Sequence, residues 1–119
     1  MAAPASPSRQ NLTLYAGRDV TLIFPAVNDE DGAPYVFEAE TVVSWWLGLS
    51  KVNPLVTKSS LLPDEITVVG NMVQVRIKHA DTTTLKPSSS GRTYMHELEV
   101  IDPDGNKFSA CIGEAIVRF

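Results

Sequence analysis

The chain of 119 residues has 44% hydrophobic and 20% charged residues, which is enough for one buried core and excludes an intrinsically disordered protein. Ten Lys and Arg against 14 Asp and Glu give a net charge of −4, so a general nucleic-acid-binding protein with a basic face is not expected. The single cysteine, Cys111, excludes an intrachain disulfide framework and a multi-cysteine zinc site.

The N-terminal residues 1–10 are mostly Ala, Pro and Ser, and they predict a flexible arm ahead of a folded domain at 11–119. Pro4 and Pro7 prevent a helix there. An arm that binds a partner is the alternative. The segment lacks the apolar stretch of a secretory signal, and no apolar run of about 18 residues occurs in the chain, so we expect no membrane contact.

From Asn11 onward the apolar residues recur at every second position, as in a half-buried β-strand. Val73, Val75 and Ile77 show this period clearly. No window of 11 residues or more has the period of an amphipathic helix. The pattern predicts strands at about 12–15, 19–25, 41–50, 55–59, 65–69, 72–78, 92–101 and 107–118.

Turn signals separate these strands. Gly70-Asn71 is typical of a two-residue β-hairpin, and Gly32 and Gly105 suit tight turns. The polar segment 80–87 predicts a single helical turn capped by Asp81 or Thr82, with Leu85 entering the core. Seven to eight short antiparallel strands with such turns predict an all-β, immunoglobulin-like (Ig-like) β-sandwich.

Four segments carry a resemblance to a known group of proteins. They are the hairpin at 66–77, ADTTTL at 80–85, YMHELEVIDPDGN at 94–106 and GEAIV at 113–117. Over residues 17–118 the chain resembles the small Ig-like domains of tailed-phage and prophage structural proteins, best known from the N-terminal domain of the phage baseplate upper protein. The resemblance implies a virion protein that is made in the cytoplasm of a bacterial host and binds other virion proteins.

Two adjacent tryptophans predict a core and a surface position. If Val43, Trp45, Leu47 and Leu49 face the core, Trp46 faces outward on the same strand. Neighbouring strands at 41–50 and 92–101 would place Trp46 beside Met95 and Ile101, which are therefore the candidate interface residues. An exposed patch of this kind is typical of an interface. The alternative is that the 33–40 loop, with Pro34, Tyr35 and Phe37, covers Trp46.

No combination of residues predicts catalysis, and we expect no catalytic, cofactor-binding or metal-binding residues. His79 and His96 are expected to be surface or semi-buried hydrogen-bonding residues, and Cys111 a buried, inert thiol. The acidic turn at 28–32 lacks the ligand spacing of a calcium-binding loop and is expected to be solvated. The sequon at Asn11 is expected to be unused without a secretory signal.

The combined expectation is a non-enzymatic structural protein of a phage or prophage virion, in the tail, the baseplate or the head–tail junction. It would act as a protein–protein interaction module, alone or as a homo-oligomer, and would bind neither nucleic acid nor membrane. The alternative is an Ig-like recognition module that binds a host surface or a carbohydrate, for which a surface pairing of Trp46 with Tyr35 would be a sign. A soluble enzyme would need a deep pocket with a perturbed histidine.

Overall fold

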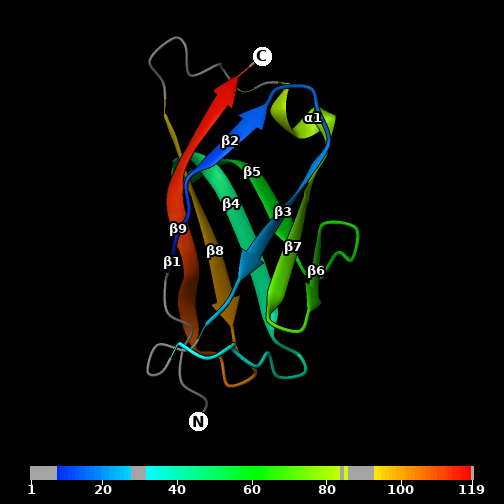
Figure 1. Ribbon diagram of the computed structural model, residues 1–119, viewed down its shortest axis with the longest axis vertical. Coiled ribbons are helices and arrows are strands. Elements are labelled where there is room, and N and C mark those ends of the chain that lie inside the picture. The colour runs from blue at the N-terminus through cyan, green and yellow to red at the C-terminus, as the bar shows by residue number, and fades with distance from the viewer. Residues whose placement is uncertain (1–7, 28–31, 84, 86–92, 119) are drawn as a thin grey trace.

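The computed structural model describes residues 8–27, 32–83, 85 and 93–118, and within these residues the chain forms nine strands and one short helix (Figure 1). Each of the eight expected strands is present, with ends within two residues of the expected ones. The elements are β1 (Ser8–Arg9), β2 (Leu12–Tyr15), β3 (Val20–Pro25), β4 (Val42–Ser50), β5 (Asn53–Ser59), β6 (Ile66–Val69), β7 (Met72–Ile77), α1 (His79–Thr82), β8 (Tyr94–Ile101) and β9 (Lys107–Arg118).

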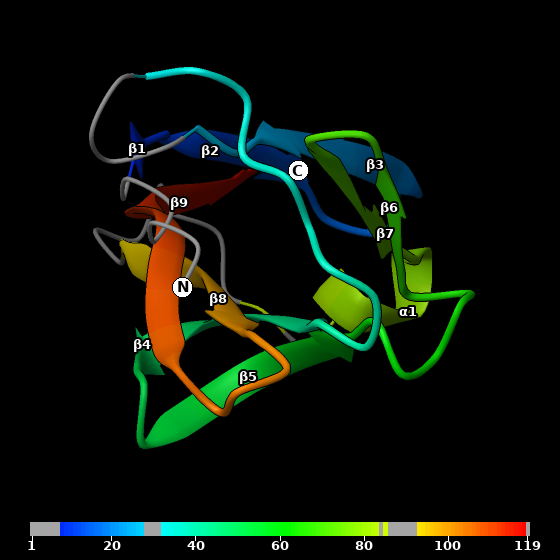
Figure 2. The same ribbon diagram turned by 90° about the horizontal axis from the view of Figure 1, so that it is seen from below.

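The described strands form two sheets that enclose the core. A six-stranded sheet has the order β1-β9-β8-β4-β5, with β2 also paired to β9, and a three-stranded sheet has the order β3-β7-β6. Seen end-on, the six-stranded sheet curves around the core and the three-stranded sheet closes the opposite side (Figure 2). This strand order is that of an Ig-like sandwich, so the predicted fold class is confirmed.

The two sheets meet at a group of buried rings. Phe24 of β3 lies with its ring centroid 5.7 Å from that of His96 on β8, and the Trp45 ring of β4 lies 6.1 Å from the same imidazole. In Ig domains a disulfide joins the strands that correspond to β3 and β8, and a tryptophan packs against it. Here a Phe–His contact occupies that place. Tyr94, which is also buried, has the spacing from His96 that the conserved tyrosine of this fold has from the second cysteine.

Two hydrogen bonds hold the His96 imidazole in one tautomer. Trp45 Nε1 donates to His96 Nδ1 at 3.2 Å, and because an indole N–H is only a donor, Nδ1 is the acceptor nitrogen. His96 Nε2 therefore carries the proton and donates to the carbonyl oxygen of Gln10 at 2.6 Å. His96 is fully buried, so its predicted surface or semi-buried position is wrong.

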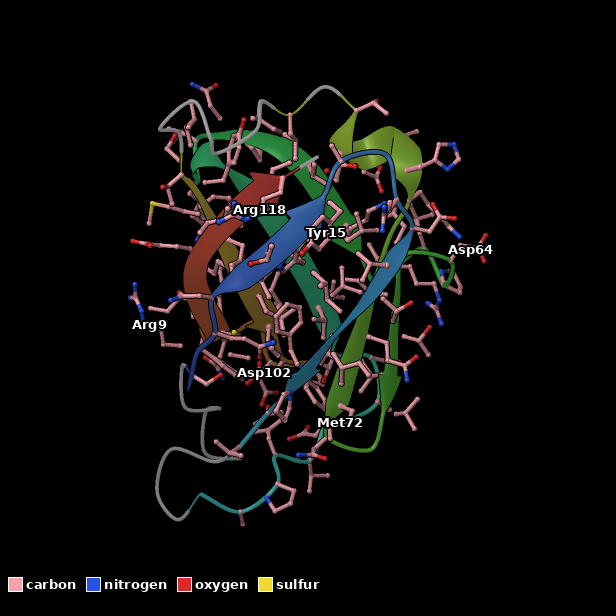
Figure 3. The ribbon with its side chains drawn as sticks, turned by 45° about the horizontal axis from the view of Figure 1, so that its top comes forward. Arg9, Tyr15, Asp64, Met72, Asp102 and Arg118 are labelled. Carbon is pink, nitrogen blue, oxygen red and sulfur yellow. The ribbon has the colours of Figure 1, made fainter. Side chains whose placement is uncertain are left out.

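The sheet begins earlier than the sequence indicates. Ser8 and Arg9 pair in parallel with β9, and the Gln10 amide donates to the carbonyl oxygen of Ile112 at 2.9 Å. Gly113 permits this approach, because a Cβ at that position would overlap the Gln10 carbonyl. The next strand, β2, continues along β9 until Tyr15 pairs with Arg118 (Figure 3). Residues 8–10 thus belong to the sheet rather than to a flexible arm, and residues 1–7 lie outside the described part.

The predicted helical turn is present as α1, but it begins earlier than expected. Its N-cap is Lys78, so Asp81 and Thr82 lie inside the turn rather than at its cap. The Asp81 carboxylate accepts a hydrogen bond from the Lys78 amide at 2.7 Å and forms an ion pair with Lys58 of β5 at 2.7 Å. Leu85 is buried, as the sequence predicts.

Candidate functional site

The predicted interface residues all lie on the outer face of the six-stranded sheet, but they do not form one cluster. In the pairing of β4 with β8, Trp46 lies opposite Glu97, Met95 opposite Gly48, and Ile101 opposite Val42. Met95 is thus a diagonal neighbour of Trp46. Ile101 is two rows from Trp46, beyond the pair formed by Ser44 and Glu99. The structure therefore brings Trp46 and Met95 together and separates Ile101 from them.

The two tryptophans differ in burial as the alternation predicts. Trp45 is buried in the core, whereas Trp46 is only half-buried on the outer face. Leu49 departs from the predicted inward set and is exposed, because the β4–β5 pairing shifts its register on either side of Gly48. The Trp46 indole is held on this face by a hydrogen bond, which its Nε1 donates to Glu97 Oε1 at 2.9 Å.

A polar network surrounds Trp46 on this face. Glu97 also accepts a hydrogen bond from the Ser109 hydroxyl and forms an ion pair with Lys51 Nζ at 3.3 Å. Burial alone would raise the pKa of Glu97, but the hydrogen bonds from Ser109 and Trp46 and the charge of Lys51 lower it below its usual value. Glu97 is therefore a fixed carboxylate at the centre of the face.

A second carboxylate extends the same network. Lys51 Nζ lies 2.6 Å from Glu99 Oε2, and Lys107 Nζ lies 3.7 Å from Glu99 Oε1. The side chains of Glu97 and Glu99 are only 14% and 12% exposed, whereas those of the two lysines are more than half exposed. The network thus balances two positive charges with two negative ones.

Ile112 belongs to this face and was missed by the sequence analysis. It lies opposite Glu97 on β9 and is 40% exposed, while Met95 is 52% exposed. Strand alternation from the buried Cys111 predicts an outward Ile112, so the signal was present in the sequence. We define Trp46, Met95 and Ile112, with Glu97 between them, as the sheet-face patch.

The other residues considered for chemistry do not form a site. Cys111 is buried as predicted, and this burial raises the pKa of its thiol. His79 is exposed and lies 3.2 Å from Asp19. In the described part of the chain no group of three or more His, Cys, Asp or Glu residues could hold a metal ion, and the acidic turn at 28–31 lies outside that part. The described residues include no helix with the length and apolar character that crossing a membrane requires.

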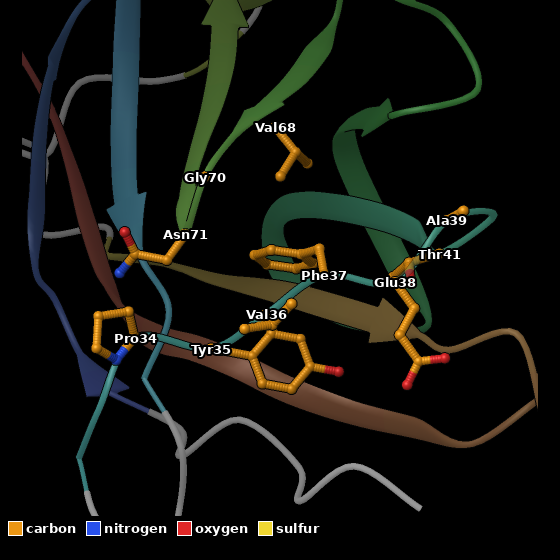
Figure 4. Close-up of a pocket in the computed structure, with 10 residues that line it drawn as sticks. All are labelled: Pro34, Tyr35, Val36, Phe37, Glu38, Ala39, Thr41, Val68, Gly70 and Asn71. Carbon is orange, nitrogen blue, oxygen red and sulfur yellow. The ribbon is translucent and has the colours of Figure 1, made fainter.

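The 33–40 loop does not cover Trp46, so that alternative is wrong. Tyr35 is buried and turns toward the end of the sandwich, where its ring contacts Phe37 at 4.9 Å and Phe108 at 5.7 Å between centroids. The loop instead forms a pocket of about 680 Å³ with the β6–β7 hairpin (Figure 4). We call this the loop-end pocket; it is lined by residues 34–39 and by Thr41, Val68, Gly70 and Asn71.

Backbone hydrogen bonds hold the two walls of the loop-end pocket together. The Ala26 amide donates to the carbonyl oxygen of Asn71 at 2.9 Å, and the Asn71 side-chain amide donates back to Ala26 at 3.0 Å. The Tyr35 amide donates to the same Ala26 carbonyl at 2.9 Å. Both walls are thus attached to Ala26, which fixes the loop against the hairpin.

No family model and no curated protein matches the chain. Among solved structures, a structure of murine CRIg is similar over 98% of this chain and 98% of its own, with 19% identity and a TM-score of 0.41. A likeness of this degree carries no functional inference, so the fold rests on its own strand order and the function on the surfaces described above.

Proposed function

We propose that this protein is a non-enzymatic interaction module that binds a second copy of itself through the sheet-face patch. The observation that carries the proposal is the exposure of Met95 and Ile112 on either side of a carboxylate that is held in place by Trp46, Ser109 and Lys51. Exposed apolar side chains around fixed polar groups are typical of protein interfaces.

Charge favours a second copy as the partner. Two like surfaces meet in a two-fold dimer, so a strongly charged face would repel itself. The network of Lys51, Lys107, Glu97 and Glu99 balances its charges, although the whole chain has a net charge of −4. A second copy would therefore meet this network without repulsion between net charges.

The setting of this module is proposed from the sequence resemblance alone. The motifs at 66–77, 80–85 and 94–106 support a structural role in a phage or prophage virion, where repeated copies strengthen modest contacts. Recognition of a carbohydrate is less well supported. Tyr35 is buried at the loop end and Trp46 lies on the sheet face, so the two aromatic residues do not form a shared surface.

Sedimentation equilibrium over a concentration series tests the proposal. We expect the unmodified chain to form dimers, and Met95→Ser or Ile112→Ser to weaken dimer formation by about tenfold each, since each change removes exposed apolar contact area worth about 1.4 kcal/mol. Both side chains are exposed, so the free energy of unfolding should change by less than about 0.5 kcal/mol.

Ile23→Ser is the matched control for these variants. Ile23 is 50% exposed on the outer face of the three-stranded sheet, far from the patch. The Ile23→Ser change should leave dimer formation unchanged. The proposal would be contradicted if the unmodified chain stays monomeric at every concentration, or if Ile23→Ser weakens the dimer as much as Met95→Ser and Ile112→Ser do.

A further inference from the structure

We propose that the loop-end pocket binds a primary alkylammonium group, presented as a lysine side chain of a partner protein. The pocket lies at the end of the sandwich and shares no residue with the sheet-face patch. A test of one proposal therefore does not decide the other.

The size and construction of the pocket suit a small group. Its volume of about 680 Å³ is within the range of ligand sites in proteins, and its lining is mostly apolar. The hydrogen bonds from Ala26 and Tyr35 already fix the loop against the hairpin. A ligand would thus enter a site that needs little rearrangement, and the methylene stem of a lysine would contact its apolar walls.

Aromatic rings line one side of the pocket. Phe37 lies between Val36 and Val68, and Tyr35 stands edge-on to Phe37 (Figure 4). The rings and the two valines therefore form an apolar wall, against which the methylene stem of a ligand would pack.

The charge around the pocket is negative. Glu38 is the one charged residue among the ten described residues that line it. Burial raises the pKa of Tyr35, and the negative charges of Asp102 and Glu38 raise it further. Both carboxylates therefore contribute negative potential at Tyr35, which lines the pocket. Asp102 and Met72 both lie toward the same end of the molecule (Figure 3).

An alkylammonium group combines the two properties that this lining favours. Its methylene stem matches the apolar wall, and its positive charge matches the carboxylate of Glu38.

A titration followed by amide NMR tests the site with n-butylammonium as the probe and n-butanol as its neutral equivalent. We expect chemical shift changes at residues 34–41 and 68–71, and a Kd for n-butylammonium at least about fivefold lower than for n-butanol. Equal affinity for the two probes, or shift changes spread over other surfaces, would overturn the proposal.

Two single variants separate the site from general charge effects. Glu38→Gln should raise the Kd for n-butylammonium by about fivefold or more. Glu40→Gln, which removes an exposed carboxylate that does not line the pocket, should change that Kd by less than about twofold. Equal effects of Glu38→Gln and Glu40→Gln would overturn the assignment.

The blocked peptide acetyl-Gly-Lys-Gly-amide identifies the source of the ammonium group. If the site takes a lysine of a partner protein, the peptide should bind at the same residues at least as tightly as n-butylammonium. Binding of n-butylammonium without binding of the peptide would overturn the lysine assignment.

Discussion

At the scale of single residues, His96 is the group on which the contact between the two sheets depends. Its ring lies between Phe24 of one sheet and Trp45 of the other, and both of its nitrogens are used in hydrogen bonds. Burial lowers the pKa of His96 below its usual value, because an imidazolium would lose its hydration there. A proton on Nδ1 would also break the bond from Trp45.

This environment predicts loss of stability in mild acid. The unfolded chain takes up a proton at His96 near the ordinary pKa of about 6.5, while the folded chain does so only at lower pH. Stability should therefore be full above about pH 6.5 and should fall as the pH decreases, by at most about 1.4 kcal/mol per pH unit. Urea unfolding at pH 5 and pH 7.5 measures the difference.

His96→Gln should remove most of that pH dependence, although it lowers stability overall. The matched control is His79→Gln, which changes an exposed histidine beside Asp19 and should leave the dependence in place. The carboxylates with a lowered pKa, Glu97, Asp19 and Asp102, titrate below this window and do not contribute. An unchanged pH dependence in His96→Gln would contradict the assignment.

At the scale of elements, the short helix α1 joins parts of the chain that are distant in sequence. Thr82 Oγ1 accepts a hydrogen bond from the Gly17 amide at 2.9 Å, next to the turn after β2. Asp81 binds both the Lys78 amide and the Lys58 ammonium. The Lys58 side chain is only 7% exposed, so Asp81 compensates a charge that water hardly reaches.

Asp81→Asn should lower the free energy of unfolding by about 3 kcal/mol, because it leaves the buried Lys58 ammonium without an anion. Asparagine keeps an oxygen that can accept from the Lys78 amide, so loss of the helix cap is not the cause. Asp19→Asn removes a carboxylate that lies 3.2 Å from His79, and both side chains are more than 60% exposed, so it should cost less than about 1 kcal/mol. Thermal unfolding of both variants measures the two losses in free energy of unfolding. Similar losses would contradict the larger contribution assigned to the Lys58–Asp81 ion pair.

The sequence predicts elements well where the period of two is undisturbed. Val43, Trp45 and Leu47 are buried as that period requires, and the eight expected strands are present. The prediction that Leu49 faces the core is wrong because a β-bulge beside it resets the alternation. A bulge leaves no clear mark in a single sequence. The sequence does not predict the parallel strand β1 for a different reason. Ser8 and Arg9 have no apolar pattern, and they pair with β9 because its edge is open to them.

At the scale of the whole molecule, the same contrast applies to the candidate sites. Trp46 and Met95 are predictable because they depend on which face of a strand a residue occupies. The loop-end pocket is not, because it depends on the path of residues 32–41, which have no period. The Glu97 network also depends on the register between strands, which places Ser109 rather than Ala110 opposite Glu99 after a bulge.

The parallel pairing of β2 with β9 has a mechanical consequence. β1 and β2 both run parallel to β9, so the described chain enters this pairing at Ser8 and leaves it at Arg118, at the opposite end of the pairing. A force that draws these two points apart therefore acts along the strands and strains the residue pairs from Ser8–Cys111 to Tyr15–Arg118 together, as in shear. An antiparallel hairpin pulled from its open end would instead lose its pairs in succession. Under tension this small domain should therefore resist extension until β2 and β9 slide apart in a single step.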